Sequence, residues 1–127
     1  MKKLMDFKEM EKRYSGGEDS LELTVEKWTR IYEFLESAFS MGHFSEVLQA
    51  AVVPLFLCVE YKDRCEFCPL FRICKRGRSE EFNRVMRVMQ AYVIAGDKLP
   101  KDPILGIVGN FIEELKKCEN DAKGRAH

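Results

Sequence analysis

Four cysteines lie close together in the middle of the chain, at a spacing that suits a metal centre. They are Cys58, Cys65, Cys68 and Cys74, in the pattern Cys-x6-Cys-x2-Cys-x5-Cys. Short loops between thiolate ligands let the sulfurs converge on one point, which a four-coordinate metal site requires. The segment therefore predicts that these four thiolates bind a metal.

The ligand spacing also indicates which metal to expect. Structural zinc sites usually have two short Cys-x2–4-Cys pairs, or one such pair and two histidines. Here only Cys65 and Cys68 form a short pair, and His43 and His127 lie far from it in the sequence. A cluster is wider than a single ion and accepts looser spacing, so a [4Fe-4S] cluster is the expected cofactor and zinc the alternative. Disulfides or unligated thiols are the further alternative for these cysteines.

The same segment is rich in basic side chains. Residues 62–87 contain eight Lys or Arg and four Asp or Glu, a local charge of +4 in a chain whose formal net charge is zero. Such a concentration of charge is typical either of a loop that contacts nucleic-acid phosphates or of a loop that is simply solvated. The candidate phosphate-binding residues are Lys62, Arg64, Arg72, Lys75, Arg76 and Arg78.

Residues 58–74 resemble the iron–sulfur loop of DNA glycosylases such as endonuclease III, which has the same cysteine spacing. In that family, basic residues between the first two ligands contact DNA phosphates, and Lys62 and Arg64 occupy that interval here. The last three cysteines, in CEFCPLFRIC, also look like the C-terminal cluster motif of recombination-type and CRISPR-associated nucleases, in which proline tends to follow the second ligand, as Pro69 does here. The resemblance implies an iron–sulfur cluster next to nucleic acid.

The resemblance does not extend to catalysis. The Leu-Pro-Gly-x-Gly turn of the glycosylases, with its following Lys and Asp, is absent, and the segment LPKDPILGIVGN from Leu99 has its prolines and glycines at other positions. The Asp and Glu-x-Lys carboxylates of the nucleases are also absent, as are a Gly-rich phosphate loop and a Ser/His/Asp set. No catalytic residue is therefore assigned.

The elements that must position the segment are helices, because apolar residues recur three and four positions apart and no alternating strand pattern occurs. We expect an all-α fold, a compact bundle of four to five helices, with the cysteine-rich loop between the third and the fourth. The expected helices span 3–14, Thr24 to about Met41, Ser45 to about Val59, Ser79 to about Gly96, and Asp102 to about Lys117. The expected inward residues of the second and last helices include Val25, Trp28, Ile31, Tyr32, Leu35, Ala38, Phe39, Ile104, Ile107, Val108, Phe111, Ile112 and Leu115.

The chain length of 127 residues suits one domain. We expect an N-terminal helix and flexible turn in residues 1–20, a single helical domain with its cluster loop (58–78) in residues 21–119, and a frayed tail in residues 120–127. A mobile N-terminal arm is favoured over an arm that docks on a partner, because glycines in SGGEDS interrupt the helical pattern. Cys118 follows the last helix and is expected not to bind metal.

Nothing in the sequence predicts a membrane segment. The N-terminus is charged, and the longest apolar run, Ala50 to Val59, is short and contains Pro54. We therefore expect a cytoplasmic protein, in which clustered cysteines bind metal more often than they form disulfides. Two functions fit: a non-catalytic subunit that binds DNA or RNA through the basic loop, or a structural subunit that contacts other proteins and whose cysteines only stabilise the fold.

Overall fold

The predicted all-α fold is confirmed. The computed structural model describes residues 3–38, 40–52 and 80–125, and every regular element within these ranges is helical. In chain order the elements are α1 (Phe7–Ser15), α2 (Ser20–Ser37), α3 (Met41–Val52), α5 (Glu80–Ala95), the short 3-10 helix η3 (Gly96–Lys98) and α6 (Asp102–Arg125).

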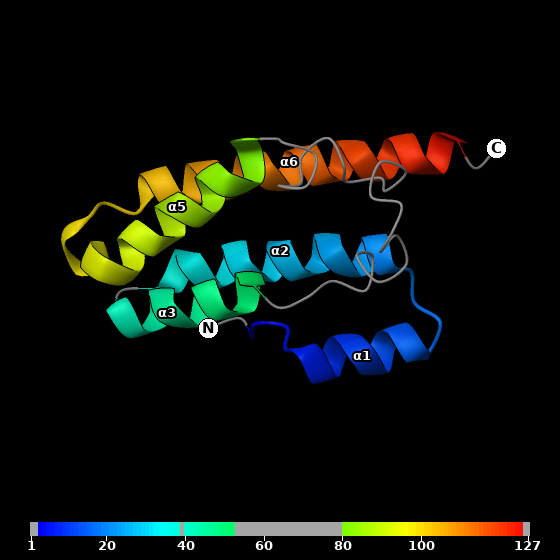
Figure 1. Ribbon diagram of the computed structural model, residues 1–127, viewed down its shortest axis with the longest axis horizontal. Helices are drawn as coiled ribbons and strands as arrows, with labels where there is room; N and C mark the ends of the chain where they lie inside the picture. Colours follow the sequence, from blue (N-terminus) through cyan, green and yellow to red (C-terminus); the bar gives the residue numbers. More distant parts are fainter. Residues whose placement is uncertain (1–2, 39, 53–79, 126–127) are drawn as a thin grey trace.

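Four of these helices form a closed bundle (Figure 1). Helices α2, α3, α5 and α6 run in alternating directions, and each packs against the next one along the chain. Helix α2 also packs against α6, which closes the ring. This is the up-down-up-down arrangement of a four-helix bundle. Helix α1 lies outside it, against α2.

The core is built from the apolar stripes that the sequence predicts. Trp28 is buried and meets Phe111 of α6 edge to face, with ring centroids 4.8 Å apart. Ile31, Ile104 and Val108 are completely buried, and each contributes roughly 2 kcal/mol by leaving water. The core role expected for Trp28 is therefore confirmed.

The boundaries of α2 differ from the prediction. The N-cap is Asp19, whose carboxylate accepts a hydrogen bond from the Glu22 backbone N–H at 3.0 Å. Thr24, the predicted cap, lies inside the helix, where its hydroxyl donates to the Ser20 carbonyl at 2.9 Å. A threonine hydroxyl that donates to the carbonyl four residues earlier is already hydrogen-bonded inside the helix, so it does not serve as the cap. The helix also ends earlier than expected, with Ala38 as its C-cap.

Helix α3 correspondingly begins earlier, at Met41 rather than Ser45. Gly42 lies in the first turn of α3, and the Ser40 hydroxyl oxygen accepts a hydrogen bond from the His43 backbone N–H. A serine that bonds three residues ahead is a standard helix start. The predicted extension of this helix to Val59 falls outside the described residues.

Helix α6 extends to Arg125, whereas the sequence places its end near Lys117 and a frayed tail from residue 120. The residues after Lys117 include no proline and several good helix formers, so nothing local stops the helix. The extension places Cys118 one turn beyond Leu115 on the buried face, where it is part of the core instead of lying past it.

Helix α1 is shorter than predicted. Asp6 caps it, accepting a hydrogen bond from the Glu9 N–H at 2.8 Å. Met5 and Met10 are buried, whereas Phe7 is 43% exposed. The sequence favours a mobile arm here, but an arm detached from the domain would not bury two methionines.

Candidate functional site

The predicted site lies between two described ranges. The structure describes the helices that lead into and out of it, and the assignments within residues 53–79 stay predictions. The residues concerned are the ligands Cys58, Cys65, Cys68 and Cys74 and the basic residues Lys62, Arg64, Arg72, Lys75, Arg76 and Arg78. The identity of the cofactor, a [4Fe-4S] cluster or zinc, depends on the same cysteines.

The two helices that flank this segment pack directly against each other. Phe44 of α3 and Tyr92 of α5 meet with ring centroids 5.3 Å apart. Gly96 allows this close packing, because a Cβ atom at that position would lie 2.4 Å from the Phe44 ring. Since α3 and α5 are antiparallel, the last described residue of α3 and the first described residue of α5 lie at the same end of the helix pair (Figure 1). The two points to which the segment is attached therefore belong to one packed helix pair.

A buried lysine links α2 to the last described turn of α3. Lys27 is 1% exposed, and its Nζ donates to the Ala51 carbonyl oxygen at 3.2 Å. The same nitrogen lies 5.8 Å from the centre of the Trp28 ring. A buried ammonium group is costly unless it is hydrogen-bonded or faces an aromatic ring, and both contacts are present here. Lys27 thus ties the centre of α2 to the point where the chain approaches the cysteine-rich segment.

Lys27 is not among the residues predicted from the sequence, although the sequence contains a signal for it. Leu23, Lys27 and Ile31 are spaced four residues apart, so they share one face of α2, and the structure buries all three. A lysine between two apolar residues at that spacing indicates either snorkelling to the surface or a buried partner. In the structure Lys27 has a buried partner, because the Ala51 carbonyl oxygen accepts a hydrogen bond from its Nζ.

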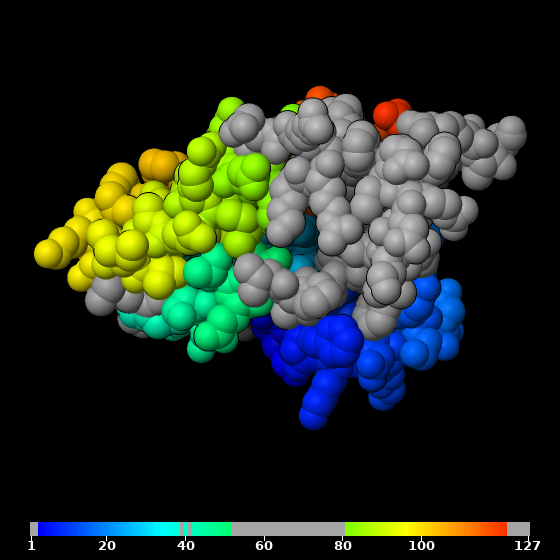
Figure 2. Space-filling view, viewed as in Figure 1, coloured from blue at the N-terminus to red at the C-terminus, as the bar shows by residue number. Residues whose placement is uncertain are grey.

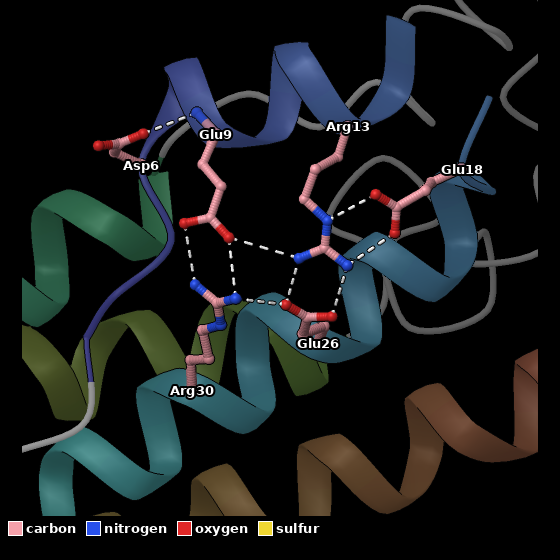
Figure 3. Close-up of polar contacts among 6 residues, drawn as sticks. All are labelled: Asp6, Glu9, Arg13, Glu18, Glu26 and Arg30. Carbon is pink, nitrogen blue, oxygen red and sulfur yellow. Dashed lines mark hydrogen bonds and ion pairs between the residues drawn. The ribbon is translucent and has the colours of Figure 1, made fainter. Parts of the chain in front are cut away.

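An ion-pair network joins α1 to α2 (Figure 3). Arg13 forms a two-pronged pair with Glu18 in the intervening turn, with both distances 2.7 Å, and Arg30 forms another with Glu9, at 2.9 and 2.8 Å. Glu26 bridges the two arginines, 2.8 Å from Arg13 Nη2 and 2.7 Å from Arg30 Nη2. Two of these side chains come from α1 and two from α2, so the network fastens the outer helix to the bundle.

The network favours the ionised forms of Arg13, Glu18, Glu26 and Arg30. Hydrogen bonds from Arg13 lower the pKa of both Glu18 and Glu26. Hydrogen bonds to Glu18 and Glu26 raise the pKa of Arg13, and a hydrogen bond to Glu9 raises that of Arg30. General acid–base catalysis needs a group that titrates near the working pH. The shifts move the pKa values of these arginines and glutamates away from neutrality, so the network is suited to joining helices and not to proton transfer.

Acidification is expected to loosen α1. The pKa values of Glu18 and Glu26 are depressed below the ordinary 4.5, so their contribution to stability is fully present above that pH and is lost as the pH falls through the depressed values. Carbon-13 NMR of the glutamate carboxyls, followed together with the α1 amide signals, should show both sets changing in one pH range. Titration of both carboxyls at the ordinary value, with the α1 amides unchanged, would contradict this prediction.

A groove of about 350 Å³ lies between α5 and α6. Val85 and Phe111 are buried beneath it, and its rim includes the cations Arg84 and Lys117 and the carboxylates of Glu113 and Glu114. The mixture of charges favours neither an anion nor a cation. The groove therefore supports no specific ligand.

The described residues contain no other group suited to a metal. Within residues 3–38, 40–52 and 80–125, no set of three or more His, Cys, Asp or Glu side chains could hold an ion. His43 is in the first turn of α3, where its ring meets Phe34 edge to face with ring centroids 5.9 Å apart. The metal hypothesis consequently depends on the 58–74 cysteines alone.

No helix in the described part of the chain is long and apolar enough to cross a bilayer. No protein family, curated protein or solved structure matches this chain.

Proposed function

We propose that this protein is a non-catalytic metal-binding subunit that contacts DNA or RNA, with a [4Fe-4S] cluster on Cys58, Cys65, Cys68 and Cys74. Zinc is the alternative metal. The observation that carries the proposal is the Cys-x6-Cys-x2-Cys-x5-Cys spacing with basic residues around it. We propose a cytoplasmic location with it, because a reducing compartment keeps thiolates available to metals.

The architecture of the bundle supports a separate task for the segment. Antiparallel neighbours in helical bundles need connections of about 2–8 residues, whereas the cluster loop predicted from the sequence, residues 58–78, is about 20 residues long. The described residues of α2, α3, α5 and α6 bury an apolar core. Metal ligation would supply the stabilisation that so long an insertion needs.

In this proposal the basic side chains contact phosphates and do not read bases. Phosphate contacts carry no sequence information and weaken steeply with salt, because each one releases a counterion. Lys62 and Arg64 are the best candidates, since they also match the basic interval of the glycosylase loop.

A binding assay across a salt series tests the nucleic-acid function. The double variant Lys62→Ala/Arg64→Ala should bind any duplex or single strand about tenfold more weakly and reduce the slope of log affinity against log salt by about 2. A matched control is Lys98→Ala/Lys116→Ala, which removes the same charge from exposed positions outside the segment. Equal effects of the two double variants would return Lys62 and Arg64 to the role of solvated charges.

A second function, that of a structural or protein-interaction subunit, is favoured by one feature of the surface. Figure 2 shows the end of α5 and the start of the α5–α6 connection at one tip of the molecule, in yellow. Within this stretch Ile94 is 77% exposed and Leu99 is 39% exposed. A patch of exposed apolar side chains is typical of protein contacts. Absence of nucleic-acid binding at the lowest salt, in protein that retains its metal, would contradict the first function and favour this one.

A further inference from the structure

Helix α5 presents one continuous face to solvent. Its inner face contains Val85, Met89 and Tyr92, which are spaced four and three residues apart and are buried. The exposed residues of the helix recur at similar spacings, so they share the opposite face: Asn83, Arg84, Arg87, Gln90, Ala91 and Ile94. Figure 2 shows this helix at the surface of the molecule, in green and yellow.

The contacts of the inner face fix the orientation of the outer one. The Tyr92 hydroxyl donates a hydrogen bond to the Pro100 carbonyl oxygen at 2.5 Å, and the Tyr92 ring packs against Phe44 of α3. Val85 and Met89 are each 1% exposed and belong to the core. A helix that is packed in this way presents its outer side chains in a defined geometry, as recognition of a rigid partner requires.

The outer face carries positive charge and no carboxylate. The chain contains 21 basic and 21 acidic residues, yet no Asp or Glu occurs between Phe82 and Gly96. By contrast, the exposed residues of α2 include Glu22 and Glu36, and those of α3 include Glu46. A face of this kind is complementary to a polyanion, and nucleic acid is a polyanion.

The carboxylates beside this face lie on its α6 side. The groove between α5 and α6 is lined by Arg84 and by three glutamates, Glu81, Glu113 and Glu114. Arg84 therefore lies at the edge of the outer face. Arg87 is four residues from Asn83 and three from Gln90, so these three side chains form one row along the middle of the face.

The side chains in this row are of the types that read bases. In the major groove of B-form DNA, which is wide enough for an α-helix, arginine pairs with guanine, and asparagine and glutamine pair with adenine. Contact with phosphates alone would need only positive charge, which lysine also supplies, and α5 contains no lysine. Ile94 ends the row with an apolar side chain, which suits the methyl group of thymine.

The same face favours duplex DNA over other nucleic acids. The major groove of an RNA duplex is too narrow for side chains to read. Proteins that bind single strands stack the bases on exposed aromatic rings. The exposed face of α5 contains no aromatic residue, because Tyr92 is buried and Phe82 packs against the core.

From the exposure, charge and side-chain types we infer that α5 is a recognition helix, whose outer face enters the major groove of duplex DNA. Arg87 pairs with guanine there, and Asn83 and Gln90 pair with adenine. This inference rests on the proposed nucleic-acid function and adds to it. Phosphate contacts from the cysteine-rich segment supply affinity, whereas α5 supplies the preference for a base sequence.

Selection from a pool of randomised DNA duplexes tests the inference on the full-length protein purified without oxygen. At about 0.15 M salt, repeated binding and sequencing should enrich a motif that contains guanine and adenine at least about tenfold over the starting pool. Pools of single-stranded DNA and of duplex RNA, treated in the same way, should yield no enriched motif.

Substitutions that leave the charge unchanged separate base reading from phosphate contact. Asn83→Ala/Gln90→Ala should bind the selected duplex about tenfold more weakly, while its affinity for an unselected duplex changes less than about twofold. Gln49→Ala/Asn120→Ala is the matched control, because it removes the same two side chains from exposed positions on α3 and α6 and should leave both affinities unchanged. Arg87→Ala should relax the preference at the guanine position. Alanine at these exposed helical positions favours the helix, so the variants should fold.

The outcomes separate this inference from the function on which it rests. Salt-sensitive binding without an enriched motif, or a motif that persists in Asn83→Ala/Gln90→Ala, would overturn the recognition helix and leave the phosphate-binding function in place. Absence of binding to every pool at the lowest salt would overturn both. A motif enriched only from the single-stranded or the RNA pool would contradict the assignment of duplex DNA.

Discussion

Removal of the proposed metal under reducing conditions is expected to lower the melting temperature by about 10 °C, which corresponds to roughly 3 kcal/mol for a domain of this size. The reason is the position of the predicted ligands between Val52 of α3 and Glu80 of α5, two helices that pack against each other. A metal that links the ends of a packed helix pair contributes its binding energy to folding. Amides of α3 and α5 should therefore lose protection first, and those of α2 and α6 later.

Two cysteine substitutions sharpen this experiment. Cys68→Ser should remove the metal, whereas Cys118→Ser should leave the metal content unchanged, because Cys118 of α6 is buried in the core of the bundle. Metal analysis and the visible spectrum of protein purified without oxygen distinguish iron from zinc. Equal metal losses from both variants would refute the ligand assignment. Unchanged melting and exchange after metal removal would refute the stabilising role. A metal-free protein of equal stability, with Cys65 bonded to Cys74 or Cys58, would favour the disulfide alternative.

Lys27→Ala is expected to lower the free energy of unfolding by about 2–4 kcal/mol. The substitution deletes a buried four-carbon stem, which leaves a cavity, and removes the charged donor to the Ala51 carbonyl. Urea denaturation measures the change. Lys116→Ala on the exposed side of α6 is the control, and it should alter stability by less than about 0.5 kcal/mol.

Lys27→Met separates the two parts of this effect. Methionine restores most of the buried volume but neither the charge nor the hydrogen bond, and it also removes the cost of burying an ammonium group. We expect it to recover more than half of the stability lost in Lys27→Ala. A Met variant as unstable as the Ala variant would show that the Ala51 contact, rather than packing, dominates at this position.

Lys27 and the residues before α1 both lie beside the same part of α3. Lys27 donates to the Ala51 carbonyl from α2, while Leu4 and Met5 line a hollow together with Gln49 and Ala50. Two elements distant from each other in sequence thus meet the last described turns of the helix that leads toward the cysteines. A substitution at Lys27 or in the residues before α1 should therefore affect this end of α3 first.

The sequence by itself determined the all-α class, the core stripes of α2 and α6, and the burial of Trp28. These features depend on apolar spacing within one helix, and apolar residues that recur every three and four positions indicate which face is buried. The ends of the helices were harder to predict from the sequence. Asp19 and Thr24 are both good caps, and the choice between them follows from the burial of Ser20, Leu21 and Leu23 in the folded protein.

Only the tertiary structure decided the partners of charged side chains. The pairs Glu9–Arg13 and Glu26–Arg30 are visible in the sequence as residues four apart, but their joining into one network requires α1 to lie on α2. Lys27 finds its acceptor 24 residues away, on another helix. A buried apolar residue needs only an apolar surface, whereas a buried charge needs one particular atom at one distance, and that atom is brought into place by the packing of the whole bundle.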